Sequence, residues 1–191
     1  MKKLISMFLV LAVFVCMLAA CGTETTYENE QVTSAPENEV LELYEILENN
    51  EEIPFTITDT ARQMLTEHPE YFKNATVDDV ADIVDYSLEY KHLAKNVDSH
   101  GDKVVCISEA SVLSIYETKL DDKNYMTEMQ VMDYNGNSFY LFALDRYENI
   151  FENDILSVYF LPIADTSFEN VSGGTTLAIV GASCHIEKVE Y

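Results

Sequence analysis

Positive charge is scarce in this chain. Its 191 residues include 11 Lys and Arg against 34 Asp and Glu, which gives a formal net charge of −23 at pH 7. Proteins bind nucleic acids by neutralising phosphates with lysine and arginine, so the composition predicts no nucleic-acid partner. Acidity of this kind keeps a protein soluble and does not by itself indicate a function.

The sequence also lacks the motifs of common enzymes. A nuclease needs carboxylates for a cation and an arginine to clamp phosphate, and only Arg62 and Arg146 are present. The GxSxG motif and the Walker-type and dinucleotide-binding glycine patterns are absent. Cys184 and His185 are neighbours on a predicted strand, so they point to opposite faces and cannot pair. We expect a non-enzymatic protein without a cofactor, with a metal-dependent hydrolase as the remaining enzyme alternative.

The N-terminus has the pattern of an export signal. Lys2 and Lys3 precede an apolar run from Leu4 to Ala20 in which Ser6 is the only polar residue. The residues Leu-Ala-Ala-Cys at 18–21 resemble the lipobox of bacterial lipoproteins. That resemblance implies cleavage before Cys21, lipid attachment to its sulfur, and a protein held by lipid on the extracytoplasmic face of the cell membrane. The alternative is an uncleaved membrane helix, for which 17 residues is at the short limit.

Four cysteines occur in the chain, and two of them belong to this N-terminal segment. Cys16 lies in the apolar run and Cys21 at its end, which leaves Cys106 and Cys184. Export would permit a disulfide between these two. Each lies in an apolar, strand-like run, where a lone cysteine behaves as a small buried hydrophobic residue. The sequence favours two buried thiols and leaves a disulfide open.

Composition divides the chain into four parts. Residues 1–20 are the predicted signal peptide, and residues 21–38 are polar and acidic. Such a segment buries too little apolar surface to fold, so it is predicted to be a flexible tether. Residues 39–97 have helical periodicity, and residues 98–191 have the alternating pattern of β-strands.

Three helices are expected in the first folded part. Val40, Leu43, Tyr44 and Leu47 share helical spacing, which predicts a short amphipathic helix. A second helix is expected to begin after Thr58 or Asp59, either of which can cap it, and to end before Pro69. The third is predicted over 76–96, with Thr76 as N-cap.

Five strands are expected after Gly101, at 103–117, 125–134, 138–145, 155–161 and 175–189. The first is expected to contain a bulge near 109–111. The second and third flank Asn135-Gly136, a strong hairpin signal. Five strands with the main irregular insertion between the third and fourth predict an α+β protein with N-terminal helices and a five-stranded, OB-like Greek-key barrel.

Residues 86–191 also resemble a family. They are similar to the OB-fold, anticodon-binding-like barrel domain of Gram-positive surface lipoproteins. The matching positions are Tyr90-Lys91, residues 101–104, Asn153-Asp154, Val158-Tyr159 and residues 186–188. The chain departs from the family pattern at Asn153, where a glycine is usual. The resemblance implies the fold and no activity, because the family is largely uncharacterised.

Binding is the function that the barrel favours. OB barrels commonly bind ligands on the face of strands two and three, edged by loops. Aromatic and amide side chains there could contact an oligosaccharide, a peptide or a protein. The candidate ligand-binding residues are Tyr134, Tyr140, Phe142, Phe168 and Asn170. The alternative is a structural or assembly component of the cell envelope.

One segment has a weak metal pattern. Asp133, Asn135 and Asn137 alternate like the ligands of a calcium loop, but the loop's glycine at position six and its distal glutamate are missing. The same residues fit a β-hairpin, and we expect that structure.

Overall fold

The computed structural model describes residues 39–48, 53–122, 124–169 and 173–190, all within one compact unit, Pro36–Tyr191. The predicted signal peptide, the tether, Cys21 and Asn170 lie outside the described residues. No helix in the described part is long and apolar enough to cross a membrane.

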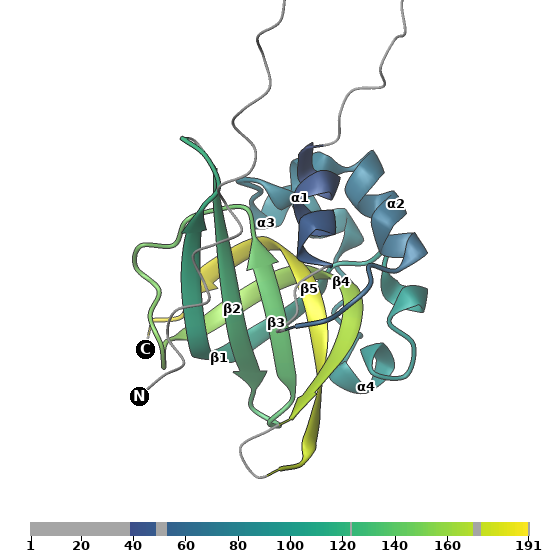
Figure 1. Cartoon of the computed structure of the whole chain (residues 1–191), viewed down its shortest axis with the longest axis vertical. Coiled ribbons are helices and arrows are strands. Elements are labelled where there is room, and N and C mark those ends of the chain that lie inside the picture. The colour runs from purple at the N-terminus through teal and green to yellow at the C-terminus, as the bar shows by residue number, and fades with distance from the viewer. Residues whose placement is uncertain (1–38, 49–52, 123, 170–172, 191) are drawn as a thin grey trace, which may run out of the picture. The chain divides into compact units, whose positions relative to one another are not determined.

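A closed five-stranded barrel forms the centre of this unit (Figure 1). Around the barrel the order is β1-β2-β3-β5-β4, and β4 pairs with β1 to close it. The β3–β5 pair is parallel and the others are antiparallel. This arrangement confirms the predicted α+β class and OB-like barrel. The strands are β1 (Val105–Lys119), β2 (Tyr125–Asp133), β3 (Ser138–Ala143), β4 (Ile155–Glu169) and β5 (Thr175–Lys188).

Alternating residues of the strands fill the barrel interior. Phe139 and Leu141 of β3 point inward and are buried, and Phe160 of β4 packs edge-on against Phe139 at 5.7 Å between ring centroids. Gly181 of β5 lies directly against this cluster. A Cβ atom there would be 2.3 Å from Phe160 Cδ2 and 2.8 Å from Leu141 Cδ2, so the interior has room only for glycine.

The Asn-Gly hairpin is confirmed. The amide of Gly136 donates to the Asp133 carbonyl at 3.0 Å, and Gly136 has a φ of 82°. This is a three-residue loop with glycine in the left-handed position, a common hairpin connection. The Asp133 carboxylate accepts from the amides of Asn135 and Asn137, each at 2.9 Å. Asp133 thus orders the turn.

Strand β4 is longer than predicted. We expected it to end at Leu161, before Pro162, but it continues to Glu169. The register shifts between Pro162 and Ala164, where Pro162 sits opposite Gly181. A bulge tolerates the missing N–H of proline, so Pro162 lies within the strand instead of ending it.

The first two helices agree with the prediction. Helix α1 spans Glu39–Leu47 and α2 spans Asp59–Glu67. The Thr58 side chain caps α2 by accepting from the Ala61 amide. A 3₁₀ turn, η1 (Pro69–Phe72), follows α2.

The predicted helix over 76–96 is wrong. Thr76 does cap a helix, but α3 covers only Val77–Val80, followed by η2 (Ala81–Ile83). Val84 then forms a parallel bridge with Val104, and the Asp85 amide donates to the Val104 carbonyl at 2.9 Å. The chain becomes helical again at α4 (Tyr90–Leu93) and η3 (Asp98–His100). Pairing with the entry to β1 therefore replaces the helical hydrogen bonds.

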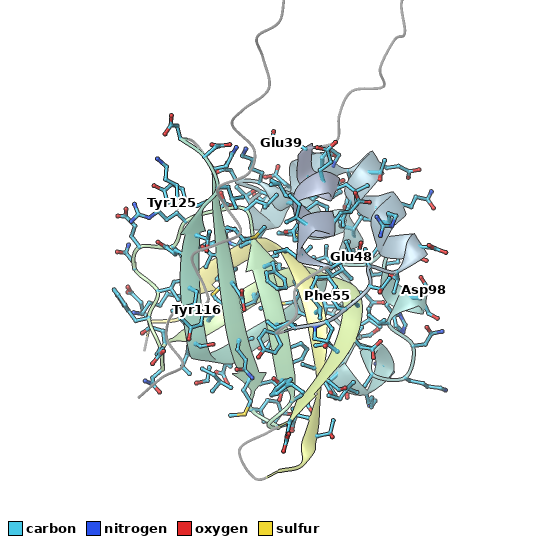
Figure 2. The ribbon with its side chains drawn as sticks, viewed as in Figure 1. Glu39, Glu48, Phe55, Asp98, Tyr116 and Tyr125 are labelled. Atoms are coloured by element: carbon cyan, nitrogen blue, oxygen red, sulfur yellow. The ribbon has the colours of Figure 1, made fainter. Side chains whose placement is uncertain are left out.

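The N-terminal segment packs on the outer surface of β3, β4 and β5, which we call the covered side. The Tyr44 hydroxyl donates to the Phe142 carbonyl at 3.1 Å, and the Phe55 and Phe142 rings lie 5.9 Å apart. The segment between α1 and α2 is bonded to β4, because Thr166 Oγ1 donates to the Pro54 carbonyl at 2.7 Å. Figure 2 shows Phe55 over these strands. The helices and the barrel thus share a second hydrophobic core.

Candidate functional site

The strand face where we expected ligand contacts is partly occupied by the protein itself. Phe142 is completely buried on the covered side, so its ring is not available to a ligand, and that expectation is corrected. Tyr140 and Phe168 are partly buried and meet edge-to-face, with 5.6 Å between ring centroids. The structure brings these two rings together. The pocket that Tyr134 borders is a different one, and neither Tyr140 nor Phe168 lines it.

This open pocket of about 510 Å³ lies at the hairpin end of the barrel. Its walls are the segment 86–93, residues 105–109 of β1 and the β2–β3 hairpin. Three tyrosines line it: Tyr86, Tyr90 and Tyr134. We call it the tyrosine pocket.

The three tyrosines differ in exposure. Tyr134 is 86% exposed at the hairpin tip, and Tyr86 is 69% exposed on the opposite segment. Tyr90 is held in place, because its hydroxyl donates to the Leu177 carbonyl at 3.0 Å and its ring packs edge-on against Phe139. Two largely exposed tyrosines therefore line the pocket together with one that is anchored to the barrel.

Sequence reasoning predicted only Tyr134 among these. Tyr86 and Tyr90 lie within the helix predicted over 76–96, and a continuous helix would give their side chains different directions. The signal that was missed is Asp85–Ser87. The Asp85 carboxylate accepts from the amide and the hydroxyl of Ser87 at 2.9 and 2.6 Å, a local turn that competes with a helix.

Carboxylates and amides supply most of the polar lining. Glu89 pairs with Lys91 at 2.8 Å, and hydrogen bonding and charge from Lys91 hold the pKa of Glu89 below its usual value. Glu109, Asp133, Asn135 and Asn137 also line the pocket. Partial burial raises the pKa of Tyr90, and the charges of Asp133 and Asp165 add to this effect. The tyrosine is therefore neutral at physiological pH and lies in a negative field.

Cys106 also lines the pocket, and its environment disfavours the thiolate. Half-burial raises the pKa of the thiol, although hydrogen bonds with Tyr159 and Ser157 act in the opposite direction. Burial, with a hydrogen bond to Cys106, likewise raises the pKa of Tyr159 to about 12. A protonated thiol is a poor nucleophile. Cys106 and Cys184 are both free thiols; Cys184 is buried as predicted, whereas Cys106 is only half-buried.

Both arginines are held by carboxylates. Arg62 of α2 pairs with Glu45 and Glu48 and so joins α2 to α1 and the residue after it. Arg146 pairs with Glu117 and Glu148, and its guanidinium lies 5.1 Å from the Tyr125 ring centroid. Within the ranges that the structure describes, no group of three His, Cys, Asp or Glu residues is placed to hold a metal ion.

Searches of protein-family models, curated proteins and solved structures give no match to this chain. The fold is therefore assigned from the barrel topology, and the resemblance to surface lipoproteins stays a prediction. The geometry of the tyrosine pocket is the observation on which a function can be proposed.

Proposed function

We propose that this chain is an extracytoplasmic lipoprotein, anchored by lipid on Cys21, whose barrel is a non-enzymatic binding module. Its ligand is an oligosaccharide, a peptide or a protein segment. The ligand contacts the tyrosine pocket, and the strand face that is usual for OB barrels is not the main site.

The exposed pair Tyr86 and Tyr134 carries this proposal. Folded proteins usually give a buried or half-buried place to an aromatic side chain, whereas these two rings border one hollow from separate segments. Concave sites lined by aromatic side chains and a few polar groups are where proteins commonly bind ligands. The raised thiol pKa of Cys106 and the paired arginines favour binding over catalysis.

Ligand-detected NMR tests the pocket. Saturation-transfer spectra of the full chain would be recorded with chitotetraose, maltotetraose and short peptides, using Tyr134→Ala and Tyr116→Ala. Tyr116 is a matched control because it is 64% exposed on β1, outside the tyrosine pocket (Figure 2). We expect at least one probe whose signal is lost with Tyr134→Ala and kept with Tyr116→Ala. Signals that both variants change equally would contradict the proposal.

The anchor is tested by Cys21→Ser. The variant cannot accept lipid on that sulfur, so we expect it to lose metabolic labelling by a fatty acid and to keep its uncleaved N-terminus. Two acyl chains give stable anchoring, so labelled wild-type protein should partition into detergent. A Cys21→Ser variant that is still labelled and processed would contradict the proposed attachment site.

A further inference from the structure

Resting on that proposed function, we infer that the tyrosine pocket binds an extended peptide segment and receives one of its arginine or lysine side chains against the exposed tyrosines that line it, Tyr86 and Tyr134. The inference adds the chemical class of the ligand to the proposed site. It stands on three properties of the pocket: exposed aromatic rings, a negatively charged lining, and a stretch of β1 that has a neighbouring strand on one side in the described ladders.

The aromatic faces favour a cation. A tyrosine ring has a negative face, which attracts an ammonium or guanidinium group within about 6 Å. Tyr86 and Tyr134 border the pocket from separate segments, and both are largely exposed. A cationic side chain that enters the pocket can therefore contact an exposed aromatic ring.

The charge of the pocket lining also favours a cationic side chain. Glu89, Glu109 and Asp133 contribute three negative charges, whereas Lys91 is the one basic side chain in the described lining. Glu89 pairs with Lys91 and Asp133 accepts from the turn amides, so what the lining offers a cation is its net negative charge. The side-chain oxygens of Asn135 and Asn137 add further acceptors. A guanidinium offers five N–H donors and no acceptor, so it matches such a lining. A sugar hydroxyl is neutral and does not complement this charge.

The strand edge favours a peptide. In the described ladders β2 pairs with β1 from Ala110 onward, whereas Val105, Cys106 and Ile107 pair with β4. Residues 105–109 line the pocket, so this part of β1 has a neighbouring strand on one side only. An extended peptide can add backbone hydrogen bonds to such an edge while a side chain fills an adjacent pocket.

Calorimetry with matched peptides tests the inference. The probe is acetyl-Thr-Val-Arg-Val-Thr-amide, and its control replaces arginine with citrulline, which has the same shape without the charge. We expect the citrulline peptide to bind the full chain about tenfold more weakly. Tyr134→Ala should weaken binding of the arginine peptide about two- to fivefold. Glu109→Gln should weaken it in the same direction, and Tyr116→Ala should leave it unchanged.

Other outcomes separate the inference from the proposed function. Equal affinities for the arginine and citrulline peptides, both reduced by Tyr134→Ala, would overturn the inference and leave the binding site in place. Binding of chitotetraose at the pocket without binding of the arginine peptide would do the same. Arginine-dependent binding that Tyr134→Ala does not affect would overturn both, because the cation would then bind elsewhere.

Discussion

Tyr44 and Tyr134 are the same type of amino acid in opposite environments, one buried and one exposed. Tyr44 on the covered side is completely buried and its hydroxyl donates to the Phe142 carbonyl, whereas Tyr134 in the tyrosine pocket is 86% exposed. Burial of Tyr44 joins the helices to the barrel and leaves no surface for a ligand. The exposed ring of Tyr134 contributes little to the free energy of folding, and its aromatic face is open to solvent. The covered side therefore supports stability, and the tyrosine pocket is the region where we propose binding.

Truncation of one ring on each side should separate the two regions most clearly. Phe142→Ala removes a fully buried ring from the core shared by the helices and the barrel, so it should reduce the free energy of unfolding by about 3–5 kcal/mol. Tyr134→Ala should change it by less than about 0.5 kcal/mol. Denaturant unfolding measures both, and a similar cost for the two variants would remove the distinction.

In the β2–β3 hairpin that borders the tyrosine pocket, backbone conformation should affect stability more than side-chain size does. Gly136→Ala has open space for the new Cβ, but its φ of 82° is left-handed, so the substitution should cost about 1–2 kcal/mol. Gly136→Asn is the control, because asparagine tolerates this conformation, as Asn153 does at a φ of 71°. The asparagine variant should be the more stable in thermal unfolding. The reverse order would contradict the assigned turn.

On the covered side, a single hydroxyl should have a measurable effect. Tyr44→Phe keeps the ring and removes the donor to the Phe142 carbonyl, so the unfolding free energy should fall by about 1 kcal/mol. The control is Tyr134→Phe, which removes an exposed hydroxyl. If the unfolding curves of the two variants coincide, the hydrogen bond does not contribute to the unfolding free energy, and this prediction is wrong.

The smallest effect is expected at Asp154, which lies on neither side. Hydrogen bonds from the Lys188 ammonium and the Phe151 amide lower the pKa of Asp154. A lowered pKa stabilises the fold above the usual carboxyl pKa of about 4, and that contribution is lost as the pH falls through the folded value. Asp154→Asn should therefore lose stability at pH 7 and differ less from the wild type at low pH. A difference that grows toward low pH would contradict this sign.

The barrel could be predicted from the sequence because its determinants are local. Alternation marked all five strands, and Asn135-Gly136 marked the hairpin. Asn153 stands where the resembled family has glycine, and its left-handed φ of 71° explains why a glycine or asparagine is suited to that position.

The errors in the prediction have mostly non-local causes. The segment 76–96 has a helical pattern, but α3 ends at Val80 and η2 at Ile83. The local turn at Asp85–Ser87 and the pairing of Val84 with Val104 together replace the rest of the helix. Pro162 ended the predicted fourth strand, although a bulge opposite Gly181 accommodates it. Phe142 alternates like a ligand-facing residue because the pattern cannot show that Phe55 covers it. Tyr86 and Tyr90 were not predicted as pocket residues because the segment that contains them was expected to be a helix.

The most direct test is a chemical-shift map of the ¹⁵N-labelled protein titrated with acetyl-Thr-Val-Arg-Val-Thr-amide. Binding at the tyrosine pocket predicts that the largest amide shifts occur at Tyr86, across 105–109 and across 134–137. The amides of Tyr140 and Phe168, on the strand face outside this pocket, should shift little. Shifts centred on Tyr140 and Phe168, with none at Tyr86 or Tyr134, would contradict the assignment of the binding site.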